Sequence, residues 1–374
     1  MSKQIYLDSA ATSSVHPQVI QVMVEVLQQE YGNPSSTHSF GRSSKTLVET
    51  SRKSIAKQLN CSAQEIIFTS NGTEATNWIL TCLVKTQQVK RIITTKIEHH
   101  ATLYTVLALQ KEFAIQVDYV SILPSGAIDM NHFKELLELD ISTLVSLMHV
   151  NNEIGTVLEV EKVGAMCQDK KAFFFCDTVQ SIGKTTFDLT TLPVDFIVAS
   201  AHKFHGPKGV GFAFMRKNTK IQPLLFGGSQ EKGLRAGTEA VHQIVGMSKA
   251  FDLCYQNLEA DKKQISDLKA YCLRELLLNF PDLKVNGSDT FYNIINVLLP
   301  FSPEKTAMIL FNLDIKGIAV SRGSACQSGS VKPSHVLSEI LNDVDIKKPS
   351  IRISFSHDNC KADIDALIDG LKGI

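Results

Sequence analysis

The chain has 374 residues, more than a single hydrophobic core usually serves, so we expect one large domain and one smaller one. Its 38 basic and 38 acidic side chains give a formal net charge of zero, which lends no support to a nucleic-acid or membrane-surface partner. No apolar run approaches the roughly 20 residues of a membrane span, and the first residues lack an apolar signal core. We therefore expect a cytoplasmic protein.

Short strand-like segments alternate with helical patterns between about residues 64 and 216. The segments are 65–68, 91–95, 115–120, 143–150, 172–176, 195–200 and 211–215. This alternation predicts crossover connections and an α/β fold, with a mostly parallel seven-stranded sheet covered by helices on both faces. Ligands of such folds bind at the carboxyl ends of the strands, and polar motifs follow several of these segments.

A long helical pattern from about residue 250 to 280, ended by Pro281, is expected to carry the chain into the smaller domain. Beyond it we expect strands at 294–299, 317–320 and 351–355. Helices are expected around 303–313, 333–341 and 361–372. The predicted division is a large domain of residues 15–252 and a small α+β domain of residues 1–14 with 253–374.

Lys203 stands in Ser200-Ala-His-Lys203, at the end of the apolar run 194–199. A lysine at the mouth of a buried strand is costly to desolvate, and burial makes its amine a nucleophile toward carbonyls. A second apolar run, 172–176, ends at Asp177. Pyridoxal phosphate needs this pairing, because a lysine amine holds its aldehyde and a carboxylate keeps its ring nitrogen protonated.

A phosphate-binding site is expected where Ser70-Asn-Gly72-Thr73 opens a helical pattern after a strand. Simple helix capping is the alternative for this motif. Ser200 and His202, which flank the lysine, are further phosphate donors by position. Thr238 ends a Gly-rich loop that can reach the phosphate of a neighbouring subunit.

Four further side chains are candidates for the same site, each with a structural alternative. His99 follows a strand and can stack on the pyridine ring and shuttle protons, or be a structural histidine. Asn152 and Gln180 can hydrogen-bond the phenolic oxygen of the cofactor, or serve as turn residues. Arg352 can clamp an amino-acid carboxylate, or form a surface salt bridge.

The eight cysteines are scattered without Cys-x-x-Cys or metal-type spacing, so we expect neither a disulfide framework nor a zinc site. Cys326 differs from the others because small and polar residues surround it in 321–330, the setting of a reactive thiol. The remaining seven are expected to be small buried hydrophobic residues: Cys61, Cys82, Cys167, Cys176, Cys254, Cys272 and Cys360.

Motifs along nearly the whole chain resemble those of cysteine desulfurases, which belong to the class-V aminotransferase branch of the pyridoxal-phosphate enzymes of fold type I. The Gly323-Ser-Ala-Cys326 segment is similar to that of the subgroup with a long cysteine loop. The motifs are Leu7-Asp-Ser-Ala-Ala-Thr12, Gly32-Asn-Pro-Ser35 with His38 and Gly41-Arg42, Phe68-Thr-Ser with Thr73-Glu74, Glu98-His99, His149-Val-Asn-Asn-Glu-Ile-Gly155, Asp177-Thr-Val-Gln180, Ser200-Ala-His-Lys203 with Gly206-Pro-Lys-Gly209, Arg235-Ala-Gly-Thr238, Gly323-Ser-Ala-Cys326 and Ser350-Ile-Arg352.

The resemblance implies a role for each matching residue. Lys203 would hold pyridoxal phosphate, Asp177 would pair with the ring nitrogen, and His99 would stack on the ring. The cofactor phosphate would be held at Gly72 by Thr73, Ser200, His202 and the partner subunit's Thr238. Asn152 and Gln180 would contact the phenolic oxygen of the cofactor. Asn33 and Arg352 would bind the substrate carboxylate.

The reaction implied by the resemblance converts L-cysteine to L-alanine and leaves the sulfur as a persulfide on Cys326. A sulfur-acceptor protein would then carry it toward iron–sulfur clusters or thiolated tRNA and cofactors, and the enzyme would be a homodimer. A selenocysteine lyase or an aminotransferase on the same scaffold is the alternative, although an aminotransferase would not need Cys326. A non-catalytic sulfur-relay or scaffold protein would have no need to keep Lys203, Asp177 and Cys326.

Overall fold

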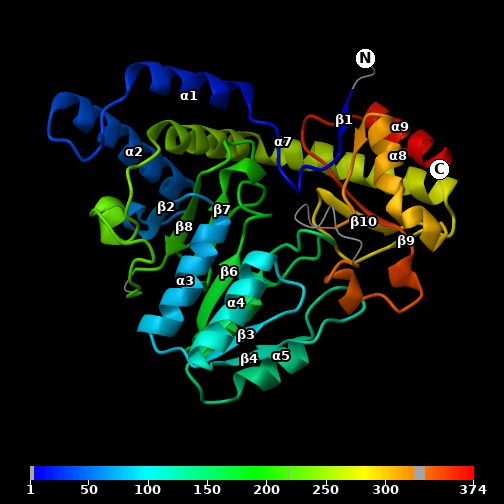
Figure 1. Cartoon of the computed structure of the whole chain (residues 1–374), viewed down its shortest axis with the longest axis horizontal. Helices are drawn as coiled ribbons and strands as arrows, with labels where there is room; N and C mark the ends of the chain where they lie inside the picture. The colour runs from blue at the N-terminus through cyan, green and yellow to red at the C-terminus, as the bar shows by residue number, and fades with distance from the viewer. Residues whose placement is uncertain (1–3, 218, 324–332) are drawn as a thin grey trace.

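A computed structural model describes residues 4–217, 219–323 and 333–374. Its centre is a seven-stranded sheet in the order β2-β8-β7-β6-β5-β3-β4 (Figure 1). The strands are β2 (Ile66–Thr69), β3 (Arg91–Thr94), β4 (Gln116–Tyr119), β5 (Thr143–Met148), β6 (Phe173–Asp177), β7 (Phe196–Ser200) and β8 (Gly211–Met215). Only β8 runs antiparallel to its neighbours, so the predicted, mostly parallel seven-stranded sheet is confirmed.

Both faces of this sheet are covered by helices, which is why its strands are apolar on both sides. One face packs against α3 (Gly72–Thr86) and α4 (His100–Phe113), with Phe175 and Val198 pointing toward them. The other face, with Phe174 and Ile197, belongs to a second core shared by five helices. These are α1 (Pro17–Gln29), α2 (Ser39–Gln58), α5 (Met130–Leu137), α6 (Val160–Asp169) and the first part of α7 (Val241–Asn279).

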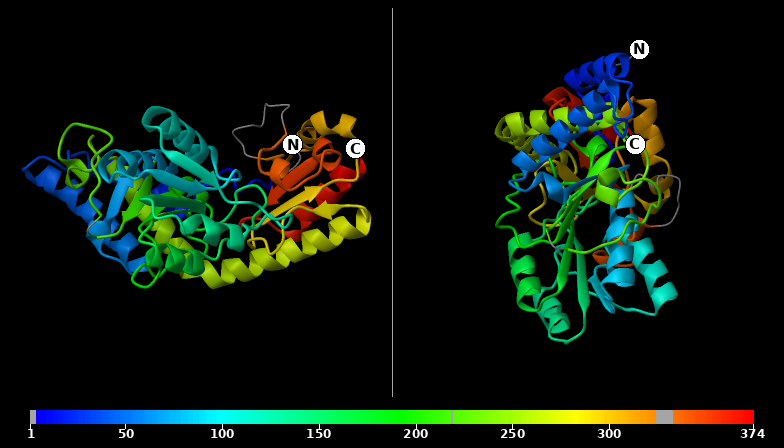
Figure 2. Two further views of the ribbon diagram at one scale, coloured as in Figure 1. Left: turned by 90° about the horizontal axis from the view of Figure 1, so that it is seen from below. Right: turned by 90° about the vertical axis from the view of Figure 1, so that its left-hand side faces the viewer.

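The long helix α7 connects this core with a third one, as the left view of Figure 2 shows. Its residues 265–276 pack with α8 (Ile309–Ile315), α9 (Lys361–Lys372) and a second sheet. The sequence pattern predicts a start near residue 250, but the helix begins at Val241. That predicted boundary is wrong because Ala240 at the N-cap provides no side-chain cap, so the sequence holds no start signal there. The division of the chain near residues 252 and 253 stays a proposal.

The second sheet is antiparallel, in the order β12-β10-β9, and a short parallel pair joins β1 to β11. The elements are β1 (Ile5–Tyr6), β9 (Lys284–Val285), β10 (Ile294–Leu298), β11 (Ile318–Ala319) and β12 (Ser350–Ser354), with 3₁₀ turns at Ala63–Glu65, Ala201–Lys203, Gln230–Gly233, Pro303–Ala307, Leu337–Glu339 and Asp345–Lys347. None of the helices in the described ranges is long and apolar enough to cross a membrane.

The helix expected over residues 333–341 is wrong, since the described part of this segment contains only the 3₁₀ turn Leu337–Glu339. Ser334 Oγ accepts hydrogen bonds from the backbone N–H groups of Val336 and Leu337, which tightens the chain into a turn. Val336 and Leu337 then insert into a small apolar cluster with Ile97 and Ile154. The apolar spacing that indicated a helix therefore reflects a turn packed against loop residues that follow β3 and β5.

Candidate active site

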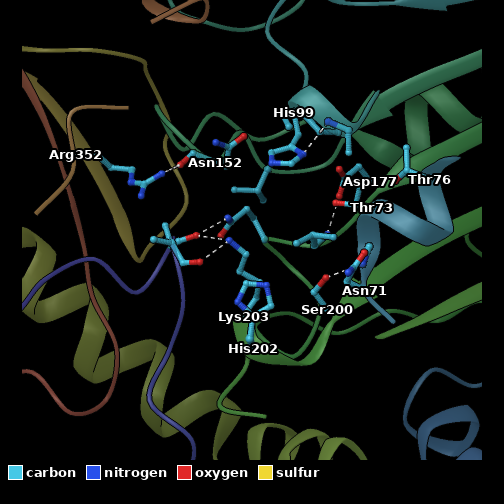
Figure 3. A pocket seen from close by; sticks show the side chains of 18 residues that line it. Asn71, Thr73, Thr76, His99, Asn152, Asp177, Ser200, His202, Lys203 and Arg352 are labelled. Carbon is cyan, nitrogen blue, oxygen red and sulfur yellow. Dashed lines mark hydrogen bonds between the residues drawn. The ribbon is translucent and has the colours of Figure 1, made fainter. Parts of the chain in front are cut away.

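A cavity of about 260 Å³ opens at the carboxyl ends of β5, β6 and β7 (Figure 3). Most of the residues expected to form a site line this cavity, although they come from distant parts of the chain. They are Gly72, Thr73, His99, Asn152, Asp177, Gln180, Ser200, His202, Lys203 and Arg352. The topology explains this convergence, because parallel neighbouring strands end at one edge of the sheet.

Lys203 and Asp177 are placed by the ends of adjacent strands. β7 ends at Ser200, and the 3₁₀ turn that follows presents Lys203, whose Nζ donates to Ala10 O at 2.7 Å and Ala11 O at 2.9 Å. Asp177 ends β6 and accepts from Val179 N at 2.9 Å. Burial raises the pKa of Asp177 above its usual range, while the Val179 N–H and the Lys203 charge oppose the rise. The carboxylate therefore favours a cationic partner in the cavity.

The amino end of α3 forms the opposite wall. Asn71 caps the helix, because its side chain accepts a hydrogen bond from Glu74 N at 2.9 Å. The helix-capping alternative therefore applies to Asn71, and the Thr73 hydroxyl is exposed at the cavity. Gly72 N donates to Ser200 Oγ at 2.7 Å. A Cβ on Gly72 would lie only 2.7 Å from Val179 Cγ2, so the wall of the cavity requires glycine here.

His99 is neutral in this environment. It is the N-cap of α4, and its Nδ1 accepts from Ala101 N at 3.1 Å, which leaves the proton on Nε2. Burial, helped by the nearby Lys203 charge, lowers the pKa of His99 to about 4. Burial and Lys203 likewise lower the pKa of His202 to about 4, and its Nδ1 lies 3.2 Å from Thr12 Oγ1.

Arg352 is buried, with 1% of its side chain exposed. It projects from β12, where Nη1 donates to Asn152 O at 2.7 Å and Nη2 to Asp8 Oδ1 at 2.7 Å. The alternative of a surface salt bridge is therefore wrong. Arg352 Nε and Gln180 Oε1 are buried and have no hydrogen-bond partner among the described residues, whereas Gln180 Nε2 donates to Ala10 O at 2.9 Å.

Two residues that were expected in the site do not line the cavity of their own chain. Asn33 is exposed in the loop between α1 and α2, where its Oδ1 accepts from Ser35 N at 2.9 Å. Thr238 is exposed beside Gly237, at a separate hollow near Arg235. Neither lines the cavity described above. Cys326 lies outside the described residues, and its role in the reaction stays a prediction.

Most of the other cysteines lie in surroundings that keep their thiols protonated and unreactive. Cys82, Cys167, Cys176 and Cys272 are buried, and Cys61 and Cys254 are partly buried. Burial raises the pKa of these thiols, to about 12 at Cys167 for example. The expectation of burial is wrong for Cys360, which is exposed at the N-cap of α9 among the polar residues that lead into that helix.

The N-terminal segment closes one side of the cavity, although no role for it was expected from the residue patterns. Ala10 and Ala11 line the cavity and offer carbonyl oxygens to Lys203, and Asp8 holds Arg352. Small residues at 10 and 11 let this backbone approach the lysine closely. Residues 7–12 show no helical or strand periodicity, so only the bare Asp-Ser-Ala-Ala pattern could have drawn attention to them.

The family model described as aminotransferase class V matches residues 5–367. The chain belongs to the class-V aminotransferase family. Cysteine desulfurase IscS of Dictyoglomus turgidum is 38% identical over 100% of this chain and 95% of that protein. Among solved structures, a NifS-like protein is 34% identical with a TM-score of 0.91 and covers 99% of both chains. A structure described as SspA in complex with cysteine is 27% identical with a TM-score of 0.81, covering 94% of this chain and 99% of that one.

Class-V aminotransferases are enzymes that depend on pyridoxal phosphate, and the cavity of this family member fits that cofactor. It offers one lysine amine, a buried carboxylate, a helix amino end for a phosphate dianion, and a neutral imidazole as part of the wall. The space that Gly72 keeps open at the amino end of α3 is one that a bound cofactor would use.

Proposed function

We propose that this chain is a cysteine desulfurase that converts L-cysteine to L-alanine and takes the sulfur onto Cys326. The observation that carries the proposal is the joint presence of Lys203, Asp177 and Arg352 in one cavity. Ser321, five residues before Cys326, is hydrogen-bonded to Arg352 of that cavity. Lys203 and Asp177 suit a pyridoxal enzyme, and Arg352 suits an amino-acid substrate.

The segment that contains Cys326 is attached directly to the cavity wall. Ser321 pairs with Arg352 through backbone hydrogen bonds of 2.6 and 3.2 Å, and its Oγ donates to Asp8 Oδ2 at 2.7 Å. Cys326 follows five residues later, so it lies within about 18 Å of extended chain from this anchor. Beyond the segment, Ser334 Oγ donates to the buried Glu153. Both flanks of the segment are therefore bonded to residues at or beside the cavity.

In the proposed holoenzyme, Lys203 Nζ would hold the cofactor and Asp177 would keep its ring nitrogen protonated. When bound, the cofactor supplies an electron sink for the bonds around the substrate Cα. The Ala10 and Ala11 carbonyl oxygens orient the lysine amine by accepting hydrogen bonds from its Nζ. The cofactor phosphate is assigned to the amino end of α3 with Thr73, Ser200 and His202, and the phenolic oxygen to Asn152 and Gln180.

Substrate binding is assigned to Arg352, with Asn33, because a guanidinium matches a carboxylate in geometry and charge. The related SspA is described in complex with cysteine, which supports this substrate class. Lys203 Nζ is assigned to take a proton from the substrate, and His99 Nε2 to give one, since His99 is neutral and carries its proton on Nε2.

The sulfur transfer needs no external oxidant. The Cys326 thiolate attacks the substrate sulfur, a sulfur–sulfur bond forms, and the carbon–sulfur bond of cysteine breaks. The products are a Cys326 persulfide and alanine, and the hydrogen atoms of the cysteine and the thiol are all accounted for in them. The same sulfur must afterwards meet an acceptor protein, so the role requires the thiol to serve both the cavity and an acceptor.

We further propose a homodimer in which Asn33 and Thr238 complete the partner's cavity. Both residues lie away from their own cavity. Large exposed apolar side chains accompany these regions, with Tyr31 75% exposed beside Phe40, and Phe226 84% exposed in the loop that leads to Thr238. A protein acceptor in iron–sulfur cluster assembly or in tRNA or cofactor thiolation, and a cytoplasmic location, remain parts of the proposal; the free thiols suit a reducing compartment.

The test is to incubate the wild-type holoenzyme, Cys326→Ala and Cys360→Ala with L-cysteine and a thiol reductant, and to measure alanine and sulfide. Wild type and Cys360→Ala should form equal amounts of the two products. Cys326→Ala should keep the yellow absorbance of the bound cofactor and lose turnover. Equal sulfide formation by all three proteins would refute the role of Cys326, and a wild type that stays colourless with added cofactor would refute the enzyme itself.

A further inference from the structure

A second cluster of ligand-type side chains lies behind the cavity. His205 comes two residues after Lys203, and His357 and Asp358 come shortly after β12, the strand that carries Arg352. One ligand-type atom from each of the three residues lies within 4.8 Å of the others. The cluster therefore connects the turn of the cofactor lysine with the loop that follows the strand of the substrate arginine.

The hydrogen bonds of His205 leave a lone pair free for an ion. Its Nδ1 lies 3.0 Å from the Ser14 carbonyl oxygen. Because a carbonyl only accepts, Nδ1 carries the proton and Nε2 carries the lone pair. A backbone carbonyl that fixes the ring of a metal-binding histidine in this way is a common arrangement around metal ligands.

His357 and Asp358 already have the spacing of two ligands on one ion. Asp358 Oδ2 accepts from Ser14 Oγ at 2.7 Å, and Oδ1 lies 3.4 Å from His357 Nε2. Zinc bonds of about 2.0–2.1 Å at a tetrahedral angle separate two ligand atoms by about 3.4 Å. On the far side of the ring, His357 Nδ1 faces Asp261 Oδ2 at 3.7 Å, a carboxylate positioned to orient the imidazole.

The surroundings provide room for a further ligand and a suitable balance of charge. A cavity of about 30 Å³ borders His205, His357 and Asp261, which is enough for a water molecule. Two carboxylates, Asp261 and Asp358, face the cluster and favour a cation. Lys184 and Lys203 border the same cavity and oppose it, but Lys184 Nζ is directed to Gln180 O at 3.0 Å, and Lys203 Nζ to the Ala10 and Ala11 carbonyls.

We propose that His205, His357 and Asp358 bind one zinc ion, with water as the fourth ligand. Two imidazoles and one carboxylate form a ligand set that zinc favours. The ion would fix the turn of Lys203 relative to the loop after Arg352, and so tie the large sheet to the smaller one. This site is independent of the proposed desulfurase reaction, because no step of that reaction uses these side chains.

Calorimetric titration of the chelator-treated holoenzyme with Zn²⁺ tests the proposal. Wild type should bind one equivalent and unfold at a higher Tm with zinc. His357→Ala should lose the site, and the isosteric Asp358→Asn should bind at least about 100-fold more weakly. Cofactor absorbance confirms that each variant is folded.

His16→Asn is the matched control. The His16 ring lies 6.3 Å from that of His357, but its Nδ1 already accepts from Gln18 N at 3.1 Å, and asparagine preserves this helix cap. The control should bind zinc like wild type. Undiminished binding by His357→Ala, or binding that Cys326→Ala abolishes, would overturn the site. Neither result would change the outcome of the desulfurase assay, so the zinc site and the desulfurase activity can be refuted separately.

Discussion

A methyl group added at Gly72 should weaken cofactor binding while leaving the fold intact. Its Cβ would lie 2.7 Å from Val179 Cγ2 and 3.1 Å from Ser200 Oγ, whereas ordinary contacts begin at 3.4 Å. In the empty protein Val179 can move into the cavity, but a bound ring removes that space. Overpacking of this kind costs about 1–3 kcal/mol. Since about 1.4 kcal/mol is tenfold in affinity, Gly72→Ala should raise the Kd for pyridoxal phosphate about 5- to 150-fold.

The assay is absorbance titration of the apoprotein with pyridoxal phosphate, accompanied by urea unfolding of the same apoprotein. Gly370→Ala is the control, because its Cβ would meet flexible side-chain atoms of Ile318, Leu313 and Lys316, at 3.0, 3.1 and 3.9 Å, and Gly370 does not line the cavity. The control should change stability alone. A Gly72→Ala protein that binds the cofactor as tightly as wild type would refute the close packing assigned to this wall.

Three further substitutions test separate parts of the structure. Arg352→Lys cannot contact both the Asn152 carbonyl and Asp8, so the KM for L-cysteine should rise at least about tenfold with cofactor absorbance unchanged; an unchanged KM would contradict the assigned role. Arg52→Met leaves the Glu231 carboxylate buried without its bidentate partner, so urea unfolding should show a loss of about 3–5 kcal/mol, and a loss under about 1 kcal/mol would count against a buried ion pair. Burial lowers the pKa of His149 from 6.5 to about 4, so the unfolded chain binds a proton at this imidazole more readily than the folded one. The free energy of unfolding should therefore fall by up to about 3 kcal/mol as the pH drops from 6.5 to 4. His149→Asn should make this decline shallower, and an identical pH profile would show that His149 does not cause it.

The positions of the central strands were predictable because their signal is local. Segments such as 172–176 and 195–200 are short, apolar and bounded by polar residues, and the observed β6 and β7 match them within about one residue. Their carboxyl ends carry Asp177 and Lys203, so the topology of a parallel sheet was sufficient to predict that these two residues meet. Helix α9 was predicted at its observed bounds for a similar reason, since its apolar and charged residues alternate clearly.

Features that depend on tertiary contacts were not predictable. The start of α7 lacks a capping side chain, and the turn at Leu337–Glu339 takes its shape from the apolar cluster it fills. Arg352 is buried because Asp8, more than 340 residues earlier, supplies its counter-charge. The approach of His205 to His357 likewise joins residues about 150 positions apart, which no spacing rule for metal ligands would find.

The most direct test of the central claim is mass spectrometry of the holoenzyme after incubation with L-cysteine in the absence of reductant. One additional sulfur atom should appear on the peptide that contains Cys326 and none on the peptide with the exposed Cys360, and Lys203→Ala should abolish the addition. A protein that releases alanine without sulfur on Cys326, or that gains sulfur there equally in Lys203→Ala, would contradict the proposed transfer.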